Sequence, residues 1–441
     1  MNISTNRLVV IGLIVALVLI FILLVSGVIP GTRRDDPNEG AISGTLSVWG
    51  MGENELSFQT ILSGFNRFKG LTVTYRDFTS LEQYETELLE ALATGVGPDI
   101  FMIRNDMLPK YENKLSPLLT TTLNPYRLSE LFPKVVGKDF VANDQIYALP
   151  LSIDTLALFY NRDLFAQRAV FAPATWDDFV ALIPKLTEYG PGRQIVSPGA
   201  AIGGSKKNME HAIDVLYLLM AQTGAASGKT TNEAPRLSSE TSLQALDFYS
   251  QFANAGSSAY TWNGTLPNDL ELFSEGKLPI WFGYASDITK IKTRAPFLDF
   301  RVVAVPQLKG ASVRVAFPRY FGFGVSRQSF NQILAWEFIT ELTTQVENVR
   351  AYAAQTGRLP ALFQAMTDYT DHPELSVFMN QAFIADSWIR GNPLLSDVYV
   401  SRMIESVSGG SQTSGQAASE TQGRIDEMLE RLKPIQPQEK L

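Results

Sequence analysis

Residues 80–106, SLEQYETELLEALATGVGPDIFMIRND, join a helical pattern to the pattern of a buried strand. Ser80 opens a capping-box pattern, and apolar side chains then recur at helical spacing as far as Leu92. Gly95 supplies a helix stop, and the apolar run Ile100–Ile103 is short and continuous, as in a strand covered on both faces. The stretch therefore predicts a helix followed by a buried parallel strand.

The residues before this stretch show the same two periods in alternation. Residues 45–49 and 71–75 alternate polar and apolar side chains, which is typical of strands, and residues 58–68 have apolar side chains at helical spacing. The order strand, helix, strand, helix, strand predicts a doubly wound α/β sheet that starts near Gly44.

A second region with the same kinds of element follows residue 146. Its expected helices cover 176–186, 211–223, 242–254 and 332–343, and its expected strands cover 146–160, 278–282, 300–305 and 320–325. Residues 408–419 are poor in apolar side chains and predict a loop, followed by a last helix. A chain of 441 residues is long enough for two α/β lobes, at roughly 150 residues per domain.

Composition and motifs exclude several classes of function. The net charge of −8 disfavours nucleic acid as a partner, and the absence of cysteine excludes disulfides, thiolate nucleophiles and cysteine-ligated metals. Only His211 and His372 are available for histidine chemistry. The chain has no serine-hydrolase, zinc-protease, dinucleotide or EF-hand motif, and Gly224 and Gly228 are one residue too close for a phosphate loop. No catalytic, cofactor or metal site is expected.

The N-terminus predicts a membrane anchor. Leu8–Ile29 contains 22 residues without a charge, which as a helix cover about 30 Å of hydrocarbon. The run is longer than the apolar part of a removable signal peptide, so an uncleaved transmembrane helix within residues 1–30 is favoured over cleavage. Residues 31–43 combine Gly, Pro and charged side chains and predict a linker. The globular part is expected on the extracytoplasmic side of the cell membrane.

Polar and aromatic side chains stand close to the ends of the predicted strands, where open α/β sheets bind their ligands. The candidates are Glu53, Asn105, Asp106 and Asp154, with the aromatic residues Trp49, Trp262, Trp281, Tyr284, Tyr320 and Phe321. Carboxylates and rings together suit a sugar, because hydroxyl groups donate to carboxylates while C–H faces stack on rings. A structural hydrogen bond is the alternative for Asp154, and a place in the core is the alternative for each aromatic residue.

Seven segments in order resemble one protein family. They are GTLSVWGMGE (44–53), YETELLEALATGVGPDIFMIRND (84–106), YALPLSIDTLALFYNRDLF (147–165), TWDDFVALIPKLT (175–187), FSEGKLPIWFGYASD (273–287), FGFGVSR (321–327) and TGRLPA (356–361). Together they are similar to the family 1 extracellular solute-binding proteins, which are the receptors of bacterial ABC importers. The likeness covers about residues 44–435.

The resemblance implies two discontinuous, doubly wound α/β lobes with a hinge, as in the type II periplasmic binding proteins. The chain would cross between the lobes near Leu151–Phe159 and return near Phe317–Val325. The lobes would then consist of residues 44–150 with 320–365, and of residues 151–319 with 366–441.

The resemblance also implies contacts with a solute. Four positions match places where maltodextrin receptors contact sugar: Glu53, Asp106, Asp154 and Tyr284. Arg358 lies in a segment that often faces the cleft. Ile103 stands where those receptors have a stacking tryptophan, and their C-terminal tryptophan and arginine contacts have no counterpart. The implied solute is a sugar or a similar polar molecule, without a preference for maltodextrin.

The function implied is that of a membrane-tethered receptor without enzyme activity. It would bind a sugar or an oligosaccharide-like solute in the cleft and deliver it to the permease subunits of an ABC importer. The globular part is expected to be monomeric, with no cofactor, no metal and no nucleic acid partner. Two alternatives stay open: an extracellular carbohydrate-active enzyme that uses Glu53 and Asp154, and a ligand-sensing scaffold that has lost transport.

Overall fold

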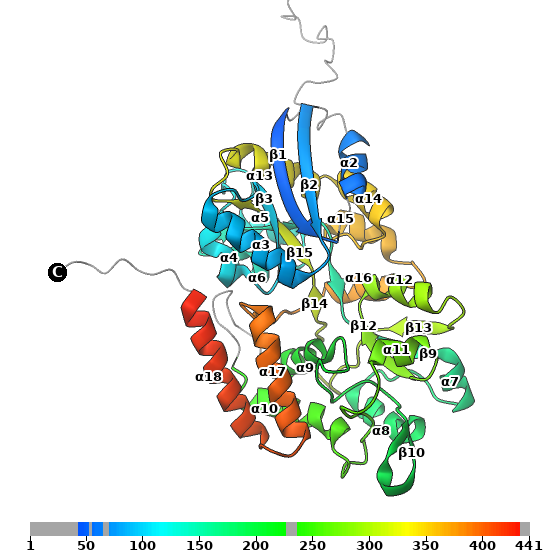
Figure 1. The fold of residues 1–441 in the computed structure, drawn as a ribbon. Helices are drawn as coiled ribbons and strands as arrows, with labels where there is room; N and C mark the ends of the chain where they lie inside the picture. The colour runs from blue at the N-terminus through cyan, green and yellow to red at the C-terminus, as the bar shows by residue number, and fades with distance from the viewer. Residues whose placement is uncertain (1–42, 53–54, 65–69, 226–235, 433–441) are drawn as a thin grey trace, which may run out of the picture.

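The computed structural model describes residues 43–52, 55–64, 70–225 and 236–432 (Figure 1). The predicted anchor, all but the last residue of the predicted linker, and Glu53 lie outside the described residues. Within the described ranges, no helix combines the length and the apolar content needed to cross a bilayer.

The first sheet contains the parallel core that the sequence predicts. β1 (Ser43–Met51) pairs in parallel with β2 (Gly70–Phe78) on one side and with β3 (Ile100–Arg104) on the other. α2 (Glu55–Gly64) connects β1 to β2, and α3 (Leu81–Thr94) connects β2 to β3. The expected order of strand, helix, strand, helix, strand is therefore confirmed.

Both ends of α3 follow from its sequence. The Ser80 hydroxyl accepts a hydrogen bond from the backbone N–H of Gln83 at 3.4 Å. Gly95 ends the helix with a φ of 76°, a left-handed conformation that glycine adopts without strain. All five residues of β3 are buried, which accounts for the uninterrupted apolar run in that strand.

One strand of the first sheet comes from much later in the chain. β15 (Phe321–Ser326) lies between β3 and β4 (Leu115–Ser116) and runs antiparallel to both. β7 (Leu149–Pro150) also pairs with β15 in antiparallel fashion.

The second sheet departs from the expected parallel arrangement. β9 (Ala157–Asn161) lies between β12 (Ile280–Gly283) and β13 (Phe300–Val303) and is antiparallel to both. β9 follows directly on the passage from the first sheet, just as β15 follows the return passage. Each of these two strands begins at the end of its sheet that is nearest the other sheet. Each is therefore antiparallel to its neighbours.

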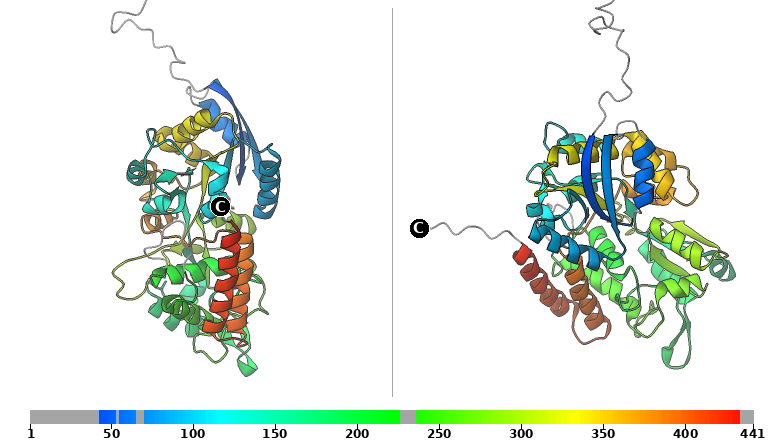
Figure 2. Two further views of the ribbon diagram at one scale, coloured as in Figure 1. Left: turned by 90° about the vertical axis from the view of Figure 1, so that its left-hand side faces the viewer. Right: turned by 45° about the horizontal axis from the view of Figure 1, so that its top comes forward.

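The two passages lie side by side. β8 (Asp154–Thr155) pairs antiparallel with β14 (Pro318–Arg319), and both fall within the segments expected to cross. A third passage runs beside them, because Ala385 forms an isolated bridge with Ala316. Figure 2 shows the two sheets in separate halves of the molecule. The lobe boundaries inferred from the sequence stay predictions.

The C-terminal helices correct one expectation. α17 (Pro393–Ser408) and α18 (Ser414–Leu432) pack against each other along the second half (Figure 2), and α18 begins inside the segment 408–419 that was expected to be a loop. Thr413 and Gln416 cap α18 reciprocally, since each side chain accepts the backbone N–H of the other at 3.1 and 3.3 Å. Ala417 and Ala418 are buried, so small side chains form the packed face there.

The other elements cover the two sheets. The helices expected at 176–186, 211–223, 242–254 and 332–343 are α8 (Trp176–Leu186), α9 (Ala212–Gln222), α10 (Glu240–Ser250) and α13 (Gln332–Thr344). The remaining helices are α4 (Leu108–Tyr111), α5 (Pro125–Leu131), α6 (Lys134–Phe140), α7 (Arg162–Gln167), α11 (Asp269–Ser274), α12 (Ala285–Arg294), α14 (Val346–Thr356), α15 (Phe363–Met366) and α16 (Ser376–Ala382). The short strands are β5 (Val141–Ala142), β6 (Gln145–Ile146), β10 (Glu188–Tyr189) and β11 (Ile195–Ser197).

Candidate functional site

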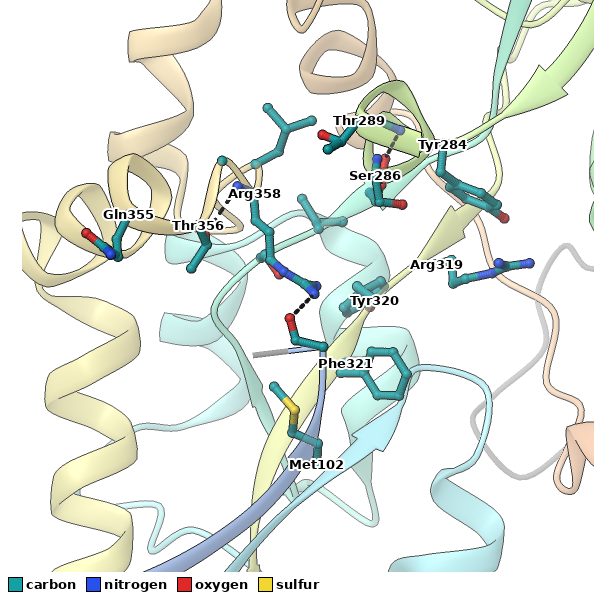
Figure 3. Close-up of a pocket in the computed structure, with 17 residues that line it drawn as sticks. Met102, Tyr284, Ser286, Thr289, Arg319, Tyr320, Phe321, Gln355, Thr356 and Arg358 are labelled. Carbon is teal, nitrogen blue, oxygen red and sulfur yellow. Dashed lines mark hydrogen bonds between the residues drawn. The ribbon is translucent and has the colours of Figure 1, made fainter. Parts of the chain in front are cut away.

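A pocket of about 370 Å³ lies beside the crossing strands β8 and β14 (Figure 3). The half of the molecule that contains the first sheet contributes Gly52 after β1, Met102 in β3, Gln355 and Thr356 at the end of α14, and residues 357–359 after that helix. Residues 284–286 and Thr289, at the start of α12, line it from the second half. The pocket is therefore walled by both halves, as the sequence predicts for a cleft between two lobes.

Five of the eleven expected site residues line this pocket. They are Asp154, Tyr284, Tyr320, Phe321 and Arg358. Five others lie elsewhere: Trp49, Asn105, Asp106, Trp262 and Trp281. Glu53 lies outside the described residues, although its neighbour Gly52 is part of the wall.

A backbone contact fixes the position of Arg358 in the pocket. Its Nη2 atom donates a hydrogen bond to the carbonyl oxygen of Gly52 at 2.8 Å. Gly52 has a φ of 76°, and a Cβ atom at this position would lie 2.4 Å from Nη2 of Arg358. The left-handed φ favours glycine, as the sequence indicates for the turn after β1, and a Cβ atom there would displace the end of the Arg358 side chain.

We expect Gly52→Ala to lower the free energy of unfolding by about 1–3 kcal/mol, because it adds left-handed strain and a clash with Arg358. Gly137→Ala is the matched control, since Gly137 lies inside α6 and a methyl group added there would point into open space. That change should raise stability by up to about 1 kcal/mol. Urea unfolding of both variants measures the difference, and equal effects would contradict the steric argument.

Asp154 takes the structural role that the sequence left as an alternative. Its Oδ1 atom accepts the backbone N–H groups of Ala285 and Thr155, both at 2.9 Å, and its Oδ2 atom accepts that of Ser286 at 3.0 Å. The carboxylate therefore joins β8 to the first turn of α12, whose N–H groups have no partners within the helix. Burial raises the pKa of Asp154, although the N–H groups of Ser286 and Ala285 act in the opposite direction.

Asn105 and Asp106 form hydrogen bonds with buried side chains. Nδ2 of Asn105 donates to Asp139 at 3.1 Å, and Asp139 also accepts the Tyr320 hydroxyl at 2.6 Å. Asp106 accepts two hydrogen bonds of 2.7 Å from Arg104. Burial raises the pKa of Asp139 to about 7, against the hydrogen bonds that its carboxylate accepts.

Of the three expected tryptophans, Trp262 and Trp281 are fully buried, and Trp49 is half-buried. The Nε1 atom of Trp262 donates to Asn208 at 3.2 Å. Trp49 packs on Phe78 with ring centroids 5.4 Å apart, and the Arg76 guanidinium lies 4.8 Å from the Trp49 ring centre. The contacts of Trp262 correspond to the core alternative, whereas Trp49 packs against the margin of the core.

The family model for bacterial extracellular solute-binding proteins matches residues 61–376. This match covers well over half of the chain. The chain belongs to the bacterial extracellular solute-binding proteins.

Several relatives have a name or a solved structure. The solute-binding protein is 24% identical over 345 residues to the maltotriose-binding protein of Pyrococcus abyssi. This match covers 74% of this chain and 68% of the relative. Its fold matches the cyclic α-maltosyl-1,6-maltose binding protein of Arthrobacter globiformis with a TM-score of 0.71, at 15% identity, over 88% of this chain and 100% of the other. The sugar-binding protein MalE of Xanthomonas citri also gives 0.71, at 18% identity, over 88% and 98%.

Among the pocket residues of this solute-binding protein that sequence reasoning missed, one carries a charge. Arg319 in β14 lines the pocket beside Tyr320. It is the one charged residue in the stretch FPRYFGFG at 317–324, as Asp154 is in its own apolar run. The rule that singled out Asp154, a charge inside an apolar crossing segment, finds Arg319 as well.

A cluster of possible metal ligands in the solute-binding protein is an ion-pair cluster. Glu210, His211 and Asp287 place ligand atoms within 4.8 Å of one another. Lys290 donates to Asp287 at 2.7 Å and to Glu210 at 3.3 Å. Burial alone would lower the pKa of His211, but hydrogen bonds to Asp214 and Asp287 raise it to about 9. A protonated ring beside an ammonium group opposes the binding of a cation.

Proposed function

We propose that this solute-binding protein is the extracytoplasmic receptor of an ABC importer for a sugar or an oligosaccharide. The observation that supports this most directly is the pocket beside the crossing strands, which both halves of the chain line. Its wall combines hydroxyl, amide and guanidinium groups with the partly exposed ring of Phe321, a combination that suits a polyhydroxylated solute. The names of the relatives described above, which refer to sugars, agree with this class of solute.

The mechanism is a shift between open and closed arrangements of the two halves. A solute that contacts Ser286 and Thr289 on one side and Thr356 and Arg358 on the other binds the closed arrangement more tightly. It therefore stabilises closure by the difference between its two affinities. The paired two-residue strands β8 and β14 are the expected hinge. Closure would then present a composite surface to the permease.

The tether and the partners belong to the same proposal. The uncharged run Leu8–Ile29 would hold the receptor at the membrane as an uncleaved helix, with residues 31–43 as the linker. The globular part would work as a monomer outside the cytoplasm, with lobes of residues 44–150 with 320–365 and of 151–319 with 366–441. It would bind its solute without converting it.

A thermal-shift screen tests the proposal. The full chain in a mild detergent is heated with D-glucose, D-galactose, D-mannose, maltose, maltotriose or trehalose. A sugar present at one hundred times its Kd should stabilise the protein by about 2.7 kcal/mol and so raise the Tm by several degrees. Amino acids and peptides serve as controls and should give no shift. If none of the sugars raises the Tm, or if new reducing ends appear during incubation, the receptor proposal fails.

A further inference from the structure

Arg319 joins the pocket wall to the interior of the protein. About 35% of its side chain is exposed, whereas its ion-pair partner Asp214 is only 2% exposed. The guanidinium Nη2 atom donates to the Asp214 carboxylate. The guanidinium of Arg319 can therefore contact both a solute in the pocket and the buried carboxylate of Asp214.

Two neighbouring side chains fix the plane of this guanidinium. Its central carbon lies 4.4 Å from the ring centre of Tyr284, and Figure 3 shows Arg319 and Tyr284 extending side by side. His211 packs edge-on against the same tyrosine ring, with centroids 5.1 Å apart and planes at 81°. A planar group that is held at one nitrogen and stacked on a ring loses little freedom when it binds a further partner.

Buried partners also hold Asp214 as an anion. Burial alone would raise the pKa of Asp214, but the charges of Arg319 and Arg390 keep it well below its ordinary value. Arg319 therefore has an anionic partner before any solute arrives. An anionic solute would compete with Asp214 for the guanidinium, whereas neutral hydroxyl groups would not.

Arg319 keeps hydrogen-bond donors for a solute. A guanidinium carries five N–H groups on three nitrogen atoms. Within the part of the chain that the structure describes, Arg319 donates its hydrogen bond to Asp214 from Nη2, and the same atom lies 3.5 Å from Nδ1 of His211. The N–H groups on Nε and Nη1 are therefore the donors that remain on this side chain, about 35% of which is exposed.

We infer that Arg319 is a solute-binding residue, oriented by Asp214 and Tyr284 to donate hydrogen bonds to neighbouring hydroxyl groups of an uncharged sugar. The inference rests on the proposed function and deepens it, because it names a contact residue and selects neutral sugars over sugar acids and sugar phosphates.

Calorimetry on variants of the full chain tests the inference. The sugar with the largest thermal shift in the screen is titrated into the wild type, Arg319→Gln and Arg319→Lys. Removal of a charge-assisted donor should weaken binding 10- to 100-fold in Arg319→Gln. Arg319→Lys keeps the charge beside Asp214 but lacks the planar fork, so an intermediate loss is expected. Arg301→Gln is the control, because Arg301 pairs with Asp299 at 2.9 Å far from the pocket and should bind within about twofold of wild type.

Two further comparisons separate the possible outcomes. One monodeoxy derivative of the chosen sugar should bind about tenfold more weakly to the wild type, with no additional loss in Arg319→Gln. D-Glucuronate and glucose 6-phosphate should bind more weakly than D-glucose. Equal affinities of wild type and Arg319→Lys, or tighter binding of the acidic sugars, overturn the inference and leave the receptor function intact. A wild type that binds no sugar overturns the proposed function itself. If Arg319→Gln does not fold, Arg319→Lys decides.

Discussion

Replacement of Arg390 by methionine should lower the free energy of unfolding by about 3–5 kcal/mol. Arg390 is 4% exposed, and its guanidinium contacts three carboxylates. Nη1 donates to Asp397 at 3.0 Å, Nη2 donates to Asp214, and Nε lies 3.2 Å from Asp106 without the alignment of a hydrogen bond. Removal of the cation leaves each carboxylate buried with fewer partners. The desolvation penalty of these buried anions is larger than the interaction energy of the lost contacts themselves.

Arg390 contacts carboxylates from both halves of the molecule, so the loss of stability in Arg390→Met should affect both halves. Asp106 follows β3 in the first sheet, whereas Asp214 lies in α9 and Asp397 in α17, on the side of the second sheet. The backbone N–H of Arg390 also donates to the carbonyl oxygen of Asp106 at 3.1 Å. The residue therefore ties the two halves together next to the crossing strands, and its loss should also reduce the cooperativity of unfolding.

Urea unfolding of the full chain, followed by tryptophan fluorescence, measures the effect of Arg390→Met. Arg431→Met is the matched control, because Arg431 is exposed and pairs with Glu427 one turn earlier in α18. Its stability should stay within about 0.5 kcal/mol of wild type. A loss below about 1 kcal/mol in Arg390→Met would mean that water reaches the three carboxylates and replaces the arginine.

Local periodicity explains why much of the fold can be predicted. The helical spacing up to Leu92, the stop at Gly95 and the apolar run after Ile100 are all short-range signals, and α3 and β3 follow them closely. The direction of a strand within its sheet is set by where the chain enters. β9 and β15 therefore gave no local sign that they would run antiparallel to their neighbours.

The candidate site was predictable only in part, because partners lie far apart in the sequence. The position of Asp106 after a strand was read correctly, yet its nearest buried cations are Arg104 and Arg390, the second of them 284 positions away. Asp154 was found by the same reasoning, and its partners are backbone groups 131 and 132 positions later. A position at the end of a strand thus predicts that a carboxylate lies near a cleft. Whether that carboxylate binds a solute or forms hydrogen bonds within the protein depends on the tertiary fold.

Between pH 6.5 and pH 9 the solute-binding protein should lose up to about 3 kcal/mol of stability, chiefly through His211. This histidine is 3% exposed, and Nε2 lies 2.9 Å from Asp287, whereas Nδ1 lies 3.6 Å from Asp214. These carboxylates raise its pKa from 6.5 to about 9, against the effect of burial. A raised pKa stabilises the folded state fully below pH 6.5, and the stabilisation disappears as the pH rises through 9.

The range from pH 7.5 to pH 9 isolates this effect. The chain has two histidines and no cysteine, and the raised pKa values of Asp139 and Asp269, about 7 and about 6, affect the slope mainly below that range. The free energy of unfolding should fall by up to about 1.4 kcal/mol per pH unit there.

His211→Gln removes the titrating group and gives the decisive comparison. The variant should be less stable than wild type at pH 6 by up to about 3 kcal/mol, and its stability should change little from pH 7.5 to pH 9. His372→Gln is the control, because His372 is exposed and accepts local hydrogen bonds from the backbone N–H groups of Glu374 and Leu375. It should keep the wild-type slope. A His211→Gln variant with an unchanged slope would show that the buried ring is uncharged near neutral pH. Asp214 and Asp287 would then be held as anions by Arg319, Arg390 and Lys290 alone.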